Sequence, residues 1–215
     1  MFTGKTIIFV IRGIAGHPSD QLEWEYELRD KLIRKINRPV VAISYATTFA
    51  TVWDRRKWRG QRFGHVLRHF TADDWRVHMI MHSEGTVVGS DGMFWAGWPR
   101  IESVHYLCGA CNSDLERLGV GPALKRNQIG QFHAYVAGQD EAMRWENIGI
   151  GKRLFGLQPR SQSMGLRGPT NVSPDLDGSV HLHKGDPWDK YGHSDCWDAE
   201  NIDRTAAELL NNLRA

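Results

Sequence analysis

The sequence has few cysteines and no long hydrophobic run. Three cysteines in 215 residues, an odd number, make a poor disulfide framework. Cys108 and Cys111 form a C-x-x-C motif, but the chain has no second such pair to complete a zinc site, so we expect buried free thiols. No apolar stretch reaches the roughly 20 residues that span a bilayer, and no signal-peptide pattern opens the chain. The sequence therefore predicts a cytoplasmic protein with no membrane span.

The sequence also lacks an excess of charge and a nucleotide-binding motif. The net charge of +2 argues neither for nor against an anionic partner. No G-x-G-x-x-G or Walker motif follows the first apolar run, which disfavours a nucleotide-binding fold. Hydrophobic residues make up 41% of the chain and charged residues 24%, which is ordinary for a globular protein. We therefore expect one domain over residues 1–215 and predict no cofactor and no metal.

Six short runs that are rich in β-branched residues alternate with helical patterns. Most of them do not alternate polar with apolar residues, which is typical of strands buried on both faces. The runs are Thr6–Ile11, Val40–Tyr45, Val77–Met81, Ser103–Leu107, Phe132–Ala137 and Val180–His183. Strands that alternate with helices imply right-handed crossovers. The pattern thus predicts an α/β fold, with a mainly parallel sheet flanked by helices on both faces.

Three further segments can be interpreted. Ser19 or Asp20 can cap a helix near the N-terminus, and its shared face would hold Leu22, Tyr26, Ile33 and Ile36. Asp198 can cap the last helix, whose apolar residues recur at helical spacing: Ile202, Ala206, Leu209, Leu210 and Leu213. Residues 147–178, rich in Gly, Pro, Arg and Ser, are too long for an ordinary connection. They form either a lid over a site, with a short helix, or an irregular surface excursion.

One serine lies at a sharp turn in the stretch RVHMIMHSEGTVVG, residues 76–89. The strand ends at His82, a helix begins after Gly85, and Ser83 lies between them. Ligands of open parallel sheets bind beyond the carboxyl ends of the strands. The first N–H groups of a helix also suit a developing oxyanion. Ser83 is therefore a candidate nucleophile, whereas we expect His82 to point into the sheet and to be structural.

The turn MHSEG resembles the G-x-S-x-G nucleophile elbow of the α/β-hydrolase family, with Met81 in place of the first glycine. The family places its acid and then its histidine after later strands, and Asp140 and His193 occur in that order. The resemblance spans Lys5 to Leu213. It implies a catalytic triad of Ser83, Asp140 and His193, with Asp114, after the preceding strand, as the alternative acid.

The first strand adds to this resemblance. The segment TIIFVIRGIAGHPSD is similar to the family's early strand followed by His-Gly, with Arg12 in place of the histidine and Gly13 kept. The resemblance implies that the backbone N–H groups of Ile14 and Glu84 form the oxyanion hole. It implies a serine esterase that forms an acyl-enzyme. Because no large cap domain is present, we expect a small or extended acyl ester as the substrate.

Two other classes of function remain open. Met81 and Arg12 are compatible with a catalytically inactive binding protein on a hydrolase fold. His181 and His183, at alternate positions of a strand and followed by Asp186, could instead hold the metal of a metal-dependent hydrolase, with His193 nearby.

A basic run lies between Trp53 and Phe70. Its cationic residues from Arg55 to Arg62 form either a solvated helix face or a contact for an anionic substrate or nucleic acid near the site.

Overall fold

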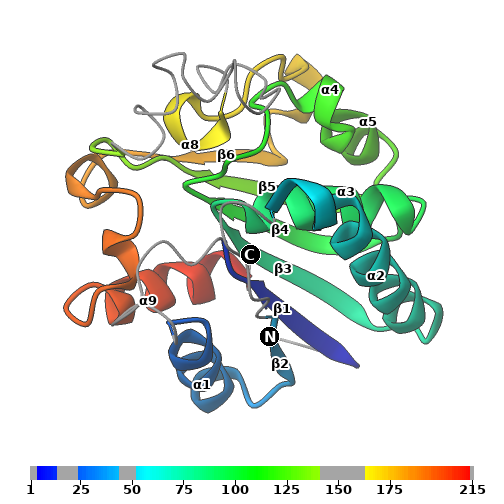
Figure 1. Cartoon of the computed structure of the whole chain (residues 1–215), viewed down its shortest axis with the longest axis horizontal. Helices are drawn as coiled ribbons and strands as arrows, with labels where there is room; N and C mark the ends of the chain where they lie inside the picture. Colours follow the sequence, from blue (N-terminus) through cyan, green and yellow to red (C-terminus); the bar gives the residue numbers. More distant parts are fainter. Residues whose placement is uncertain (1–3, 14–23, 44–51, 141–162, 214–215) are drawn as a thin grey trace.

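A six-stranded parallel sheet forms the centre of the molecule (Figure 1). The computed structural model describes residues 4–13, 24–43, 52–140 and 163–213, with residues 52–57 as backbone only. The strands are β1 (Thr6–Ile11), β2 (Val40–Ile43), β3 (Arg76–His82), β4 (Ile101–Leu107), β5 (Ile129–Tyr135) and β6 (Val180–His183). Their spatial order is β2-β1-β3-β4-β5-β6. The predicted α/β fold with a parallel sheet is confirmed.

The central strands are buried on both faces, which explains why their sequences are rich in apolar residues. All residues of β1 are buried, as are all residues of β3 after Arg76. The predicted ranges of β1 and β6 match the structure. Strands β4 and β5 begin earlier than predicted, with Ile101 and Ile129, which pair with each other. In β5, Gly130 separates Ile129 from the apolar residues that follow it. A Cβ atom at Gly130 would lie 2.6 Å from the carbonyl oxygen of Glu102, so glycine is required inside this strand.

Helices cover both faces of the sheet (Figure 1). One face carries α2 (Val52–Ala72), α3 (Gly85–Trp95), α4 (Leu115–Leu118) and α5 (Val120–Lys125), and the other carries α1 (Trp24–Ile36) and α9 (Ile202–Leu213). The short helices are α8 (Met164–Arg167), η2 (Pro174–Leu176), η3 (Trp188–Lys190) and η4 (Asp195–Trp197). Among the described helices, none has the length and apolar character that crossing a membrane requires.

The buried face of α1 differs from the predicted one. Its core residues recur every four positions: Trp24, Leu28, Leu32 and, partly buried, Ile36. Tyr26 and Ile33, which we expected on this face, are 38% and 39% exposed. The prediction was wrong because it chose the wrong stripe of an apolar-rich helix, and the rest of it, Leu22 and the two proposed caps, lies outside the described residues.

The apolar face of α9 is as predicted, but its start is not. All five predicted apolar residues are buried. The helix begins at Ile202 rather than directly after Asp198. Residues 195–197 form η4, and the carbonyl of Asp198 accepts from the N–H groups of both Asn201 and Ile202, which makes a turn that leads into the helix. This irregular approach to α9 lies between His193 and the helix.

A ladder of histidines crosses the face of the sheet that α9 covers. His105, His133 and His181 are register partners on β4, β5 and β6, and their rings stack with centroids 4.4 and 4.6 Å apart. His133 Nδ1 is hydrogen-bonded to His183 Nε2 at 3.1 Å, and His183 Nδ1 lies 3.2 Å from Glu208 Oε1 on α9. Burial lowers the pKa of His133 to about 3 and keeps its ring neutral, because desolvation disfavours the charged form.

We expect the fold to lose stability as the pH falls from about 6.5 to about 4. Burial lowers the pKa of His78 to about 4, and those of His82 and His133 to about 3. Unfolded histidine titrates near 6.5, so in this window the unfolded chain binds more protons and acidification favours unfolding. The cost is roughly 1.4 kcal/mol per group and per pH unit. Thermal unfolding measured between about pH 7.5 and about pH 5 tests this.

A pair of variants separates the buried histidines from histidines in general. His133→Gln should reduce the dependence of the melting temperature on pH, whereas His65→Gln, at an exposed position on α2, should leave it unchanged. A melting temperature that does not change with pH across this range would contradict the expectation.

Candidate active site

Ser83 lies in the turn between β3 and α3, in a backbone conformation that is uncommon for a residue with a side chain. Its φ is 53°, in the left-handed region. Its N–H donates to the carbonyl of Leu107 at 3.0 Å, and its carbonyl accepts from the N–H of Thr86 at 3.1 Å. The surrounding hydrogen bonds therefore hold the strained turn in place. Strained residues of this kind cluster at functional sites.

Two glycines allow the end of β1 to lie directly against this turn. A Cβ atom at Gly85 would lie 2.5 Å from the carbonyl oxygen of Ile11 and 2.6 Å from that of Arg12, and backbone atoms cannot move aside. A Cβ atom at Gly13 would lie 2.6 Å from Ser83 Cβ. Strands β1 and β3 are neighbours in the sheet, and β2 lies on the other side of β1. Ser83 is thus at the switch point of the sheet, where open α/β folds bind ligands.

Met81, the departure from the elbow pattern, is accommodated by a glycine on the helix above it. Its side chain is fully buried, and a Cβ atom at Gly89 on α3 would overlap its Sδ atom. The family pattern has a small residue on the strand, whereas this chain has the small residue on the helix. The space between β3 and α3 is therefore compatible with a turn at Ser83.

This exchange of large and small residues predicts coupled effects on stability. Gly89→Ala should lower the free energy of unfolding by up to about 3 kcal/mol, because overpacking against Met81 exceeds the gain of about 1 kcal/mol in helix propensity. Met81→Ala in the same chain should recover part of the loss. Urea unfolding of the two single variants and the double variant measures the coupling. Strictly additive effects would contradict the proposed contact.

The structure brings Ser83, His193 and Asp140 together in a chain of hydrogen bonds. His193 Nε2 lies 2.8 Å from Ser83 Oγ, and His193 Nδ1 lies 2.8 Å from Asp140 Oδ2. The side chain of Asp140 is fully buried, while that of His193 is 18% exposed. A carboxylate only accepts hydrogen bonds, so Nδ1 carries the proton and the lone pair of Nε2 faces the serine hydroxyl. This is the arrangement in which an imidazole can remove a proton from serine.

The loops that carry the acid and the histidine are joined by backbone hydrogen bonds. Asp140 follows β5, and His193 lies between η3 and η4. The N–H of Gly138 donates to the carbonyl of Trp188 at 2.8 Å, and that of Gln139 donates to the carbonyl of Tyr191 at 3.0 Å. These bonds fix the two loops relative to each other before any side chain is considered.

His82 supports the position of His193, a role that the sequence did not reveal. Its Nε2 lies 2.8 Å from the carbonyl oxygen of His193, so it donates a hydrogen bond to that backbone. Its ring also packs edge-on against Trp24 and Trp197. Burial, followed by the nearby His193, lowers the pKa of His82 to about 3, so the ring is neutral. We expected His82 to be structural, and the group that it holds is the backbone of the loop that carries His193.

The predicted oxyanion hole is described in part. Glu84 directly follows Ser83, is buried and precedes the first residue of α3, so its N–H belongs to the start of the helix. Ile14 lies outside the described residues. Arg12, which replaces the histidine of the family pattern, forms a buried ion pair with Glu25 of α1, with Nη1 and Oε1 3.0 Å apart. The side chain of Arg12 thus has a partner in the core.

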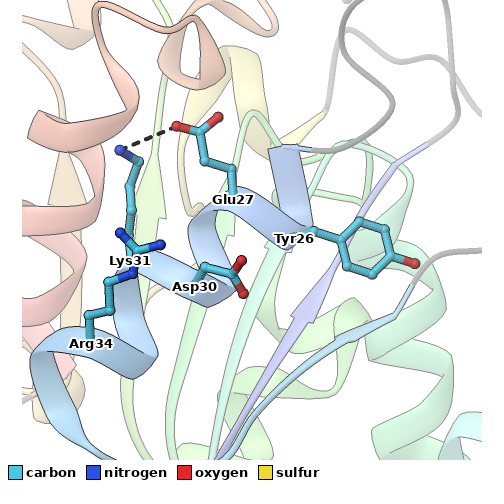
Figure 2. A pocket seen from close by; sticks show the side chains of 5 residues that line it. All are labelled: Tyr26, Glu27, Asp30, Lys31 and Arg34. Carbon is cyan, nitrogen blue, oxygen red and sulfur yellow. Dashed lines mark ion pairs between the residues drawn. The ribbon is translucent and has the colours of Figure 1, made fainter.

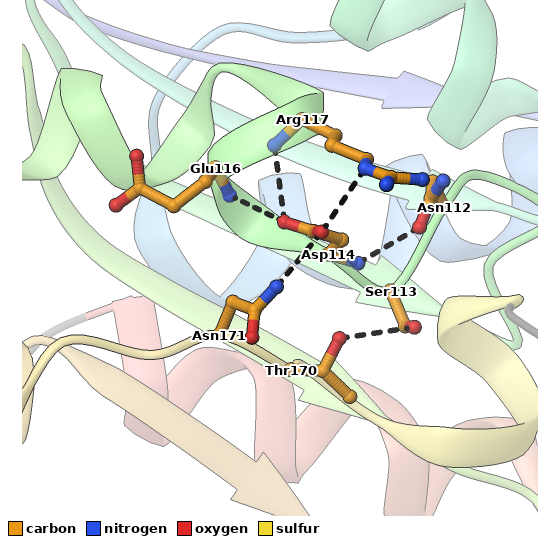
Figure 3. A network of polar contacts seen from close by, with 7 residues as sticks. All are labelled: Asn112, Ser113, Asp114, Glu116, Arg117, Thr170 and Asn171. Carbon is orange, nitrogen blue, oxygen red and sulfur yellow. Dashed lines mark hydrogen bonds and ion pairs between the residues drawn. The ribbon is translucent and has the colours of Figure 1, made fainter.

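Asp114, the alternative acid, caps a helix instead (Figure 3). Its carboxylate accepts hydrogen bonds from the N–H groups of Glu116 and Arg117 at 3.0 and 3.1 Å and from the Asn171 side chain at 2.8 Å. The backbone bond from Arg117 is the main cause that lowers the pKa of Asp114. Figure 3 shows these partners around the carboxylate of Asp114, a residue of the loop that follows β4.

The described part of the predicted lid packs against the same loop. Residues 163–178 contain the short helix α8, in agreement with the short helix predicted for this segment, and Met164 is buried. The N–H groups of Met164 and Gly165 donate to the carbonyls of Cys111 and Gly109 at 2.9 and 2.8 Å. This portion is therefore part of the folded body. The rest of the proposed lid, up to residue 162, lies outside the described residues.

The side chains of the metal-hydrolase alternative have other partners. His183 contacts His133 and Glu208, and the ring of His181 stacks on that of His133. Asp186 pairs with Lys190 at 2.8 Å. Within the described residues, these side chains form no cluster of three metal-binding groups.

The C-x-x-C motif does not act as a pair. All three cysteines are buried, as expected. Cys108 packs in the core beneath α1 and α9, whereas Cys111 packs in the core on the other face of the sheet. The motif therefore places its two sulfur atoms in different environments.

In the basic run, Arg62 stacks over the ring of Trp58 at 3.9 Å. The side chains of Arg55, Arg56 and Lys57 lie outside the described part of the structure, so the predicted anion contact stays a prediction.

A surface hollow of about 360 Å³ lies on α1, a helix that carries none of the three hydrogen-bonded side chains. Tyr26, Glu27, Asp30, Lys31 and Arg34 line it, as Figure 2 shows. Lys31 pairs with Glu27 at 3.2 Å and with Asp203 at 2.7 Å. Lys31 and Glu27 of this hollow are thus paired with each other, which is typical of a solvated helix face.

Comparisons with known proteins give only distant structural similarities. No family model and no curated protein matches the chain. Among solved structures, the chain is similar to the phospholipase PlaB from Legionella pneumophila in complex with thio-NAD, with a TM-score of 0.38 and 18% sequence identity. The match covers 54% of this chain and 28% of the phospholipase chain.

Proposed function

We propose that this protein is a serine hydrolase that cleaves acyl esters through Ser83, His193 and Asp140. One observation carries the proposal: two hydrogen bonds of 2.8 Å connect the serine hydroxyl, the imidazole and a fully buried carboxylate. The same constellation performs acyl transfer on unrelated folds, and it is recognised by geometry rather than by sequence position. The strained backbone of Ser83 at the switch point of the sheet supports the same assignment.

In the proposed reaction, His193 Nε2 removes the proton of Ser83 as the serine oxygen attacks the ester carbonyl. Asp140 holds the imidazole in the required tautomer and stabilises the imidazolium that forms. His193 then donates the proton to the leaving alcohol, which leaves an acyl group on Ser83. Water activated by the same imidazole hydrolyses this acyl-enzyme.

The negative charge of the tetrahedral intermediate would be stabilised by backbone donors. The N–H of Glu84, at the start of α3, is one proposed donor, and the N–H of Ile14 is the other. Loss of one such donor typically lowers kcat by roughly 10²–10³. Because the residues that the structure describes contain no large cap domain, we propose a small or extended acyl ester as the substrate class.

A fluorophosphonate probe tests the proposal, because it reacts only with a serine that has both a base and an oxyanion hole. We expect one probe per chain, located on the peptide that contains Ser83. Hydrolysis of p-nitrophenyl esters should be fastest for acyl chains shorter than about ten carbons. A folded protein that neither reacts with the probe nor hydrolyses any ester would instead be a binding protein on a hydrolase fold.

A further inference from the structure

Behind the proposed triad, the structure brings together two cysteines that are 88 positions apart in the sequence (196 − 108). The sulfur atoms of Cys108 and Cys196 and one ring nitrogen of His82 all lie within 4.8 Å of one another, and all three residues are buried. They come from three separate places: the end of β3, the residue after β4, and η4. We propose that Cys108, Cys196 and His82 form a binding site for a thiophilic divalent cation such as Zn²⁺ or Cd²⁺.

The distances suit such an ion after small side-chain adjustments. With Zn–S bonds of about 2.3 Å, two sulfur ligands of a tetrahedral ion are about 3.8 Å apart. Three donor atoms within 4.8 Å of one another need to approach by about an ångström at most, which side-chain rotation supplies. Two thiolates and one imidazole are a known donor set for zinc, with the fourth position left for water.

The charge balance also suits a buried ion. Two thiolates neutralise a dication, so the occupied site adds no net charge to the core. Both sulfurs bind as thiolates, and the thiol protons are released on binding. Because these protons are released, the affinity for the ion should rise with pH.

The surroundings of His82 match those of a metal-binding histidine. Such a histidine usually donates its other N–H to a carbonyl or carboxylate, which fixes the tautomer and the orientation of the ring. His82 Nε2 is bonded to the carbonyl oxygen of His193. Trp24 and Trp197, whose rings stack 3.9 Å apart, both lie edge-on to the His82 ring and hold it in place. An ion here would connect the three segments next to Ser83 and His193.

A second donor set shares Cys108. Cys108, Asp140 and His193 also have donor atoms within 4.8 Å of one another. We favour the first set because zinc and cadmium prefer thiolate ligands to carboxylate ligands. In addition, an ion in the second set would have to displace the proton between His193 and Asp140.

Titration with Cd²⁺ tests the site, because sulfur–cadmium bonds absorb in the ultraviolet. We expect one ion per chain, in the wild-type protein and equally in Ser83→Ala, so the result does not depend on hydrolysis. Cys108→Ser and Cys196→Ser should each weaken binding by more than about 100-fold. At a hundredfold excess over Kd, the ion should raise the melting temperature by roughly 5–10 °C.

Two matched variants give the controls. Cys111→Ser, at a buried cysteine of the opposite core, and Asp140→Asn, in the second donor set, should both retain the absorption band. The proposal is overturned by absence of binding, by binding that survives Cys196→Ser, or by binding that Asp140→Asn abolishes.

If a cysteine variant does not fold, alkylation of the wild-type protein by iodoacetamide gives the answer. Bound Zn²⁺ should slow modification of Cys108 and Cys196 more than that of Cys111, as measured by peptide mass spectrometry. Equal protection of all three cysteines would contradict the site.

Discussion

Replacing Ser83 by alanine is expected to abolish fluorophosphonate labelling and to lower kcat for ester hydrolysis by on the order of 10⁶. Without the hydroxyl, His193 has no proton to remove and no acyl-enzyme can form. Residual hydrolysis would come from water in the site, so it should lack a burst phase. Steady-state and burst kinetics on one p-nitrophenyl ester measure both effects.

Ser90→Ala is the matched control for this experiment. Ser90 is a buried serine of α3, bonded to the carbonyl of Thr86 and to the hydroxyl of Tyr106. It should retain labelling and lose only stability. Labelling of Ser83→Ala at the wild-type rate would show that the nucleophile is another residue.

Replacing Asp140 by asparagine is expected to lower kcat by on the order of 10⁴, with little change in KM. The amide would donate to His193 Nδ1 rather than accept from it, which places the proton on Nε2 and removes the lone pair that faces Ser83. The buried position of Asp140 means that the side chain has no solvent to compensate. The ratio of kcat values at saturating ester is the measurement.

Asp114→Asn provides the comparison that decides the acid. Asparagine caps helices about as well as aspartate, so α4 should form and activity should stay within about twofold of the wild type. A large loss of kcat in Asp114→Asn, with little loss in Asp140→Asn, would reverse the assignment.

The fold was predictable because strands that are buried on both faces have a recognisable apolar composition. The run that became β1 is apolar at five consecutive positions after Thr6, those that became β3 and β4 are rich in apolar residues, and the glycines at the turns mark where strands end. Helix α1 was harder, because Tyr26 and Ile33 are apolar residues on its exposed side. One apolar stripe on such a helix looks like another until the sheet beneath it is known.

The candidate site was predictable as a set of residues but not as a set of contacts. The order of Ser83, Asp140 and His193 after successive strands allowed them to be named, and their catalytic role stays a prediction. The match of Met81 with Gly89 depends on how closely α3 approaches β3. The bond from His82 to the backbone of His193 depends on an irregular loop. Such contacts between distant segments have no local sequence signal.

The order of the proposed triad along the chain has a consequence for when the proposed activity would arise. The hydrogen bond between Ser83 and His193 spans 110 residues, and His193 follows the last strand of the sheet. Contacts between residues so far apart form late, because the intervening chain must first be ordered. A ribosome that has made the first five strands holds a chain with the proposed nucleophile, Ser83, but without the proposed base, His193. Enzymatic activity would therefore report completion of the fold, and a chain cut short before β6 would be inert even if its remaining sheet were intact.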